Sequence, residues 1–233
     1  MPHDQAYLLA EKKIEQAQRS GATELDLSDM KLTELPEAIG QLTHLSKLDL
    51  GGELFHPPNN QIIELPESLG QLTELQWLDL SYNRLIALPE SLGRLIQLRE
   101  LDLTRNRLVS LPDWLGNLSQ LNTLKIGGNQ LTVLPETLGH LTRLTTLYAW
   151  SNQLTFLPNN FVQLKGLKIA SLHHNKLGIV PIVLQALIEL VQLDLAGNNL
   201  EQIPDWVAQI GNLSILYLGG QQSYRSSCFP RST

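Results

Sequence analysis

The chain of 233 residues has little of what marks a secreted, membrane-spanning or nucleic-acid-binding protein. Its single cysteine, Cys228, excludes a disulfide within the chain and fits a reducing compartment. The N-terminal stretch has no basic segment followed by an apolar run, and no stretch approaches the roughly 18 apolar residues of a membrane span. A formal net charge of −6 disfavours nucleic-acid binding, which needs a basic surface. These absences predict a cytoplasmic protein with neither a membrane nor a nucleic-acid partner.

Motifs for catalysis and nucleotide binding are also lacking. The sequence contains no GxxxxGK[ST], GxSxG, HExxH or CxxC. His173 and His174 are the one tight histidine pair, but adjacent residues on a strand point to opposite faces, which makes a poor metal site. We therefore expect a protein that is not an enzyme and that holds no metal and no cofactor.

Leucine at a fixed spacing is what the sequence has in abundance. Residues that open successive units lie 23 apart, except that seven extra residues, at about 53–59, separate the second opener from the third. The chain thus divides into nine units over residues 22–220, the last incomplete, with the form LxxLxLxxNxLxxLPxxLxxLxx. The openers are Ala22, Leu45, Leu75, Leu98, Leu121, Leu144, Leu167, Leu190 and Leu213.

Such a unit cannot cover its own leucines, so the units must stack to bury them. Within LxxLxL the apolar residues alternate, which predicts a short strand with leucines on one side and variable residues on the other. Stacked strands then pair in parallel about 4.8 Å apart. Leu-Pro pairs such as Leu88-Pro89 predict a stiff, extended return path. The rest of the unit is long enough for one or two helical turns on the opposite side.

This pattern resembles the leucine-rich repeat proteins over about residues 22–220, and LPxxLGxLxxL resembles their 23-residue Ras-group-like and bacterial type. The resemblance implies an α/β solenoid, a horseshoe with a parallel β-sheet on its concave face and short helical or extended segments on its convex face. It also implies an asparagine ladder between units, a task that suits an amide because it both donates and accepts. The asparagines in this slot are Asn83, Asn106, Asn129, Asn152, Asn175 and Asn198.

The stretch IEQAQRSGATELDLSDMKLTELPEAIGQLTHL carries a narrower resemblance, to the start of the repeat domain in bacterial, especially cyanobacterial, Roco proteins. In that family a GTPase and a dimerisation module follow the repeats. The chain has no such module, so this resemblance implies a recognition arm without the GTPase itself.

The two ends of the repeat array are expected to differ. Residues 1–21 are interpreted as an N-terminal capping helix, with Asp4 as its N-cap, Gly21 at its end, and an apolar face. At the other end the ninth unit lacks its asparagine and its Leu-Pro, and residues 221–233 form an irregular tail without an amphipathic pattern. We expect an uncapped end, which predicts either self-association there or a fragment of a longer protein. The apolar face comprises Ala6, Leu9, Ala10, Ile14 and Ala17.

Position five of the unit carries aspartate in each of the first four units. Carboxylates about 5 Å apart repel by roughly 0.8 kcal/mol even in bulk water, so something should offset that repulsion. In one interpretation Leu-Asp-Leu is repeat consensus, neutralised locally by Arg84, Arg105 and Arg107. In the other, the aspartates line an acidic groove for a basic segment of a partner. They are Asp26, Asp49, Asp79 and Asp102.

Aromatic residues make up only 6% of the chain, yet several fall at variable positions. Trp150 occupies position seven, which otherwise takes mostly small residues. It is interpreted either as an anchor of a protein interface or as a side chain that fills the space left by small neighbours. The candidate partner-binding residues are Trp77, Tyr82, Arg105, Tyr148, Trp150, His173, His174 and Tyr217.

The seven-residue insertion falls at the turn after the second strand, so it should leave the stacking intact. It contains Phe55, which either folds back onto the rim of the solenoid or belongs to a binding loop. The hypothesis for the whole chain is a non-catalytic module that binds a protein or peptide on its concave face. The alternative is the regulatory arm of a longer Roco-type GTPase.

Overall fold

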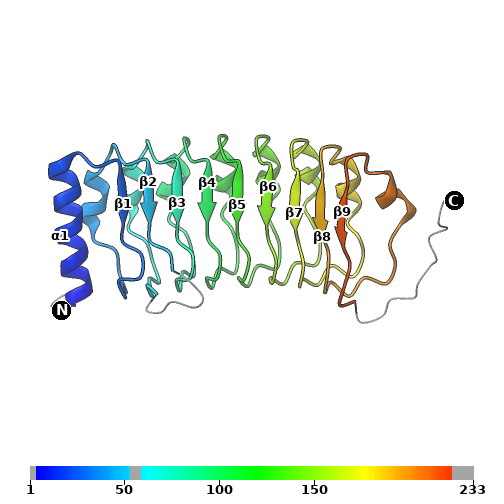
Figure 1. Cartoon of the computed structure of the whole chain (residues 1–233), viewed down its shortest axis with the longest axis horizontal. Coiled ribbons are helices and arrows are strands. Elements are labelled where there is room, and N and C mark those ends of the chain that lie inside the picture. The colour runs from blue at the N-terminus through cyan, green and yellow to red at the C-terminus, as the bar shows by residue number, and fades with distance from the viewer. Residues whose placement is uncertain (1–3, 53–58, 222–233) are drawn as a thin grey trace.

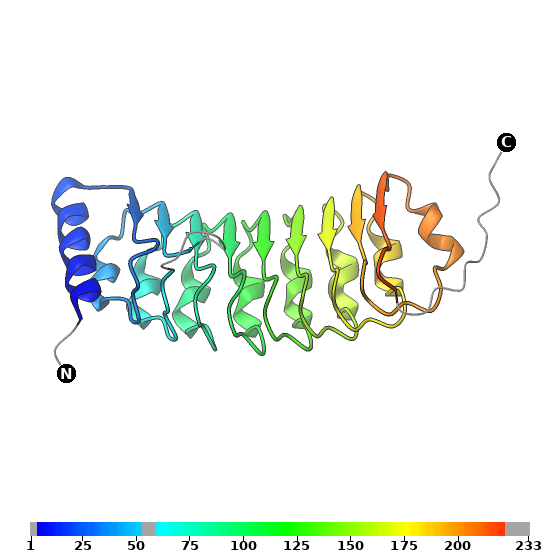
Figure 2. The same cartoon turned by 60° about the horizontal axis from the view of Figure 1, so that its bottom comes forward.

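The computed structural model describes residues 4–52 and 59–221, which form a single solenoid with a helix at its N-terminal end (Figure 1). The strands are all parallel and are arranged in the order β1 to β9. Figure 2 shows the sheet along one side of the solenoid and the short helices along the other. The strands are β1 (Glu24–Asp26), β2 (Lys47–Asp49), β3 (Trp77–Asp79), β4 (Glu100–Asp102), β5 (Thr123–Lys125), β6 (Thr146–Tyr148), β7 (Ile169–Ser171), β8 (Gln192–Asp194) and β9 (Ile215–Tyr217).

Helix α1 (Gln5–Ser20) covers the start of the sheet. Its first turn is capped by Asp4, whose carboxylate accepts a hydrogen bond from Tyr7 N, and it ends at Gly21 in a left-handed conformation (φ 65°). Ala10, Ile14 and Ala17 are buried and join the core. Ala6 is only partly buried, and the prediction that Leu9 belongs to the buried face was wrong, because its side chain is half exposed.

Parallel pairing brings the same position of every unit into register. In the middle of the strands, Leu25 lies beside Leu48, Leu48 beside Leu78, and the series continues to Leu216. These central side chains point into the core and are fully or almost fully buried from β1 to β8, while the residues on either side of them face outward. The predicted solenoid with an open parallel sheet is therefore confirmed.

The side opposite the sheet consists of short 3₁₀ helices, each preceded by a proline in an extended conformation. A glycine near the end of several of these helices allows close stacking. At Gly116, for example, an added Cβ would lie 2.5 Å from the carbonyl oxygen of Thr137 in the next unit. The helices are η1 (Glu37–Gln41), η2 (Glu67–Gln71), η3 (Glu90–Arg94), η4 (Asp113–Asn117), η5 (Glu136–His140), η6 (Asn159–Gln163), η7 (Ile182–Ala186) and η8 (Asp205–Gln209).

An amide side chain joins each unit to the one before it. Asn106 Nδ2 donates to the carbonyl of Leu80 in the preceding unit (2.9 Å) and to that of Leu103 in its own unit (3.1 Å). Its Oδ1 accepts from Leu85 N (2.9 Å). These bonds satisfy backbone groups that are buried at the turn after each strand. Bonds of the same kind are made by Asn83, Asn129, Asn152, Asn175 and Asn198, and also by Asn60.

The ninth unit continues this ladder with a glutamine, although its sequence suggested that the ladder amide was lost. Gln221 Nε2 donates to Leu195 O (2.9 Å), and its Oε1 accepts from Leu200 N (2.9 Å). The longer side chain therefore occupies the asparagine slot. The leucines of this unit are nevertheless less covered than those of other units, because Leu213, Leu216 and Leu218 are only partly buried.

The insertion, at about residues 53–59, is described only at Asn59, and its Phe55 falls outside the described residues. The units on either side of it stack as the others do. Strands β2 and β3 pair in the common register, and Asn60 Oδ1 accepts from Leu32 N at 2.9 Å.

Candidate protein-binding surface

Parallel register places the four aspartates, here called the acidic column, side by side on β1 to β4. Each carboxylate accepts a hydrogen bond from the backbone N–H two residues further along, which closes a small turn at the end of its strand. Asp194 makes the same bond far from the column, so this position has a structural use for aspartate that does not depend on a ligand. The donors to the column are the N–H groups of Ser28, Gly51, Ser81 and Thr104, at 2.7 to 3.0 Å.

The carboxylates of the acidic column differ in pKa. For Asp26, burial acts to raise the pKa, but hydrogen bonds from Ser28 outweigh it and the pKa is lowered. Burial raises the pKa of Asp49 despite the hydrogen bond from Gly51. Burial, followed by the charge of Asp102, raises the pKa of Asp79 to about 6. Asp79 therefore changes its charge near pH 6.

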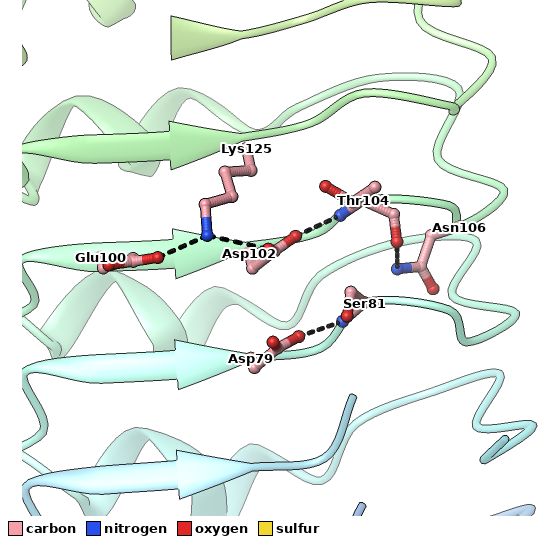
Figure 3. Close-up of polar contacts among 7 residues, drawn as sticks. All are labelled: Asp79, Ser81, Glu100, Asp102, Thr104, Asn106 and Lys125. Atoms are coloured by element: carbon pink, nitrogen blue, oxygen red, sulfur yellow. Dashed lines mark hydrogen bonds and ion pairs between the residues drawn. The ribbon is translucent and has the colours of Figure 1, made fainter. Parts of the chain in front are cut away.

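Lys125 ends the acidic column, because it occupies position five of the next strand (Figure 3). Its Nζ donates to Glu100 Oε1 (2.6 Å) and lies 3.3 Å from Asp102 Oδ2. Burial acts to lower the pKa of Lys125, but the hydrogen bond to Glu100 and the charge of Asp102 outweigh it and raise that pKa. The buried end of the column is therefore neutralised by a lysine from the neighbouring strand.

The prediction that arginines neutralise the acidic column was wrong. Over residues 4–52 and 59–221, the ion pair within 4.0 Å of a column carboxylate comes from Lys125, and the arginines of the turns make none with it. Lys47 also contributes, since its charge lowers the pKa of Asp26 and acts in the same direction on Asp49. The arginines are held away because they follow the strands, at the turn. They are Arg84, Arg105 and Arg107.

Three residues from different units form a stack on the rim of the sheet, here called the rim stack: Arg105, Trp150 and His173. The Arg105 guanidinium lies 5.2 Å from the centroid of the Trp150 ring. That ring is parallel to His173, with centroids 5.7 Å apart and 3° between the planes. His174 meets His173 edge-on at 5.1 Å. The structure thus brings together four of the residues that the sequence singled out.

A glycine between Arg105 and Trp150 makes the rim stack possible. Gly127 takes position seven in the intervening unit, and a Cβ added there would overlap the Trp150 indole. Gly128, beside it, lies against the Arg105 side chain. Trp150 therefore fills a space left by small residues, and it stays partly exposed while doing so. The space-filling interpretation of this tryptophan describes the observed arrangement, and its role as an interface anchor stays a prediction.

Position eight of the unit has a left-handed backbone in most units, a feature that the sequence analysis missed. Glycine adopts this conformation at no steric cost, and it occurs here as Gly128, Gly197 and Gly220. Tyr82, Arg105 and His174 hold the same position with φ between 53° and 58°. A bulky residue in this region costs on the order of 1 kcal/mol or more, so these three side chains are kept at a cost to stability.

The other candidate residues are spread along the sheet. Trp77 lies on β3 beneath the Lys47 ammonium, which is 4.5 Å from its ring centroid. Tyr82, with Lys31 and Arg84, lines a hollow of about 410 Å³ in the turns of the first three units. Tyr148 and Tyr217 occupy position five on β6 and β9. Lys47, Lys125 and Gly127 were not singled out from the sequence, although alignment by position puts each beside a residue that was.

The described residues contain no group of three or more His, Cys, Asp or Glu side chains arranged to hold a metal ion. Among them, no helix is long and apolar enough to cross a membrane.

The parallel-sheet solenoid with its amide ladder defines a class of repeat protein. Comparisons with known proteins identify this class. A family model for a leucine-rich repeat region matches residues 88–176, and one for a single leucine-rich repeat matches 74–95 and 189–210. The chain belongs to the leucine-rich repeat proteins. Proteins of this family generally act as non-catalytic interaction modules. A comparison with curated proteins gives no significant match.

Solved structures agree with this assignment. A leucine-rich repeat protein of Leptospira interrogans is 34% identical with a TM-score of 0.72, and the match covers 81% of this chain and 52% of that one. The plant peptide hormone receptor RGFR1, in complex with RGF2, is 28% identical with a TM-score of 0.63, over 80% of this chain and 34% of that one. The chain therefore spans about half and a third of the lengths of these two proteins.

Proposed function

We propose that the chain binds a protein or peptide partner on the sheet side of the solenoid, and that the rim stack is the centre of the site. The observation that carries this proposal is the stack itself: Arg105, Trp150 and His173, joined across the gap at Gly127. Tryptophan, tyrosine and arginine are the residues that most often dominate binding energy at protein interfaces. Stacked side chains also lose little conformational freedom when a partner binds.

Two further observations support the same surface. Arg105 and His174 keep left-handed conformations in a slot where three other units use glycine, and where Asp29, Tyr82 and Ser151 have the same conformation. Strain of this kind is found mainly where a side chain is needed for function. One of the matched structures is a plant peptide hormone receptor in complex with RGF2, which gives a precedent for recognition of a partner by this fold.

The test is selection of binding peptides from a displayed library, followed by affinity measurements with variants. We expect Trp150→Ala to weaken binding of the selected peptides by about 2 kcal/mol or more, roughly 30-fold, as for other anchor tryptophans. The matched control is Ile96→Ala, which removes an exposed apolar side chain from outside the sheet face. Thermal melting establishes that both variants fold. Equal affinities for the wild type and both variants would refute the rim stack as the site.

A second proposal for the same module is that it serves as the recognition arm of a longer Roco-type GTPase. Its support is the resemblance of the opening units to the Roco repeat domain, together with the partial coverage of longer repeat proteins. The test is a pull-down of a purified Roco GTPase module by this chain, with a GTPase of another class as control. Failure to bind the module, with peptide binding intact, would favour the first proposal alone.

Self-association through the last unit also stays a prediction. Strand β9 ends the sheet among the described residues, and its Ile215 and Tyr217 are exposed. An exposed strand edge pairs readily with another chain. The cytoplasmic location and the absence of a nucleic-acid partner likewise remain predictions from composition.

A further inference from the structure

A row of exposed apolar side chains runs along the solenoid outside the sheet face. Each unit from the second to the seventh contributes one large side chain, and these are between 40% and 66% exposed. They lie in the extended segment between the ladder turn and the proline that precedes the 3₁₀ helix, at position twelve in the second to fourth units and at position thirteen in the fifth to seventh. We call this row the apolar stripe. It comprises Ile63, Ile86, Val109, Val133, Phe156 and Ile179.

Stacking explains why this segment faces solvent but not why it is apolar. In the third unit Leu85 and Leu88 are buried, so the two residues between them must point outward. A polar residue satisfies this geometry equally well. The first unit has Thr33 and Glu34 in the corresponding places, and the eighth has Glu201 and Gln202. The stripe is therefore confined to the six units between them, as expected for a surface that is covered by something.

Charged side chains of opposite sign flank the apolar stripe. On the side of the ladder turn, position ten forms a basic row with no acidic member in the third to seventh units: Arg84, Arg107 and Lys176, with Gln130 and Gln153 between them. On the other side, the first residue of the 3₁₀ helix is acidic in the second to fifth units, whereas the sixth and seventh units have Asn159 and Ile182 there. These acidic residues are called the acidic row: Glu67, Glu90, Asp113 and Glu136. The charged members of both rows are exposed.

The basic and acidic rows of one copy of the chain can pair with the acidic and basic rows of a second copy. If two copies pack stripe to stripe about a two-fold axis along the solenoid, the basic row of each copy faces the acidic row of the other. If the axis instead crosses the solenoid within the interface, like rows face each other and repel. A two-fold contact uses the same patch on both subunits, which is the commonest arrangement in soluble oligomers.

We propose that the apolar stripe is the interface of a homodimer in which two copies pack with their long axes parallel. Six half-exposed side chains of this size present roughly 500 Å², near the upper end for a patch on a monomer. With the flanking rows the buried area approaches the roughly 800 Å² per partner of a standard interface. The stripe includes no residue of the sheet face, so both rim stacks stay accessible in the dimer.

The first experiment is sedimentation equilibrium of the wild type and variants over a wide range of concentration. We expect a monomer–dimer equilibrium for the wild type and a dissociation constant at least about 100-fold weaker for Ile86→Asp, Val109→Asp. The matched control is Ile96→Asp, which makes the same change in the third unit at a residue that is 50% exposed but lies outside the stripe. A monomeric wild type at every concentration overturns the proposal.

Variants at the last unit separate this dimer from association through β9. If Ile215→Asp, Tyr217→Asp abolishes the dimer while the stripe variant keeps it, the interface is the end of the solenoid and the stripe proposal is overturned. Thermal melting of each variant excludes loss of the dimer through unfolding.

The direction of the two-fold axis is tested by exchanging the rows. A swapped variant carries Arg84→Glu, Arg107→Glu, Glu90→Arg and Asp113→Arg. With the axis along the solenoid, the swapped variant dimerises with itself but not with the wild type, because like rows then face each other in the mixed dimer. With the axis across the solenoid, the mixed dimer is preferred. Energy transfer between differently labelled wild-type and swapped chains distinguishes the two results, and a preferred mixed dimer contradicts the proposed arrangement.

Discussion

Position five of the repeat unit carries an aspartate on β1 to β4, whereas on β5, β6, β7 and β9 it carries lysine, tyrosine, serine and tyrosine. The same contrast extends to the turns, where the rim stack joins the fourth, sixth and seventh units. We call the units of β1 to β4 the acidic half and the units of β5 to β9 the later half. The backbone does not change between these halves, because register, ladder and 3₁₀ helices continue throughout. The comparison separates positions that build the solenoid from positions that are free to specify its surface.

The two halves also differ in how their charges are balanced. In the acidic half, Lys125 pairs with Asp102 and Glu100, and the pKa of Asp79 is raised first by burial and then by the charge of Asp102. In the later half, burial lowers the pKa of His173, although the charge of Asp194 acts against it. A neutral imidazole there stacks on Trp150 without adding a second cation beside Arg105. The acidic half therefore holds a carboxylate whose charge is disfavoured by burial and by a neighbouring charge, and the later half presents stacked aromatic side chains.

The largest loss of stability is expected from changes to the asparagine ladder. The ladder asparagines make the same kind of bonds in both halves, so the loss should be equal in both. Asn83→Ala in the acidic half and Asn175→Ala in the later half each leave buried backbone groups of two units without partners. We expect each change to lower the free energy of unfolding by about 2–4 kcal/mol. Urea denaturation of both variants measures this. A difference of more than about 1.5 kcal/mol between them would break the idea of a uniform framework.

A smaller loss is expected at the close contacts between 3₁₀ helices. Gly116→Ala brings a Cβ to 2.5 Å from Thr137 O and should cost about 1–3 kcal/mol. Gly211→Ala is the matched control, because no atom lies within 4 Å of its added Cβ. Thermal denaturation should separate the two variants, and equal melting temperatures would mean that the helices shift apart without cost.

The raised pKa of Asp79 predicts a dependence of stability on pH. Because folding raises the pKa of Asp79 to about 6, the folded state binds more protons than the unfolded state between about pH 4 and 6. Stability contributed by the protonated carboxyl is therefore lost as pH rises through this range. We expect Asp79→Asn, which can keep the acceptor for Ser81 N, to stabilise the protein by about 1–2 kcal/mol at pH 7.5 and to flatten this dependence.

Asp194→Asn is the control for this charge effect. Asp194 makes the same turn hydrogen bond, but its neighbours in the register are Ser171 and Tyr217. Chemical denaturation at pH 5 and pH 7.5 should leave the stability of this variant nearly unchanged relative to the wild type. An equal gain for both variants would show that the benefit of asparagine has nothing to do with the acidic column.

The smallest effect is expected at the left-handed position. Tyr82→Gly and Ser151→Gly relieve a backbone conformation that glycine adopts freely, and should raise the free energy of unfolding by up to about 1 kcal/mol. Arg105→Gly should show a smaller gain, because it also removes the contact with Trp150. Thermal melting compares the three variants. Destabilisation of all three would mean that their side-chain contacts outweigh the backbone strain.

The spacing of 23 residues was enough to derive the solenoid, because leucines repeated at one interval can be buried only by stacking the units that carry them. The same alignment identified the ladder asparagines and the run of aspartates, since parallel register brings equal positions together. The residue type at each position of the repeat unit was therefore enough to predict the solenoid and its ladder.

Only the tertiary structure shows which contacts a residue makes when it departs from the repeat pattern. Gln221 enters the ladder because its longer side chain still places its amide within hydrogen-bonding distance of Leu195 O and Leu200 N. The residue type at this position does not reveal these bonds, because the second to eighth units have asparagine there. Trp150 meets Arg105 because Gly127 leaves room between them, and Lys125 reaches Asp102 on the neighbouring strand. These outcomes depend on side-chain length and on the space that neighbouring units leave, and both are set only when the units have stacked.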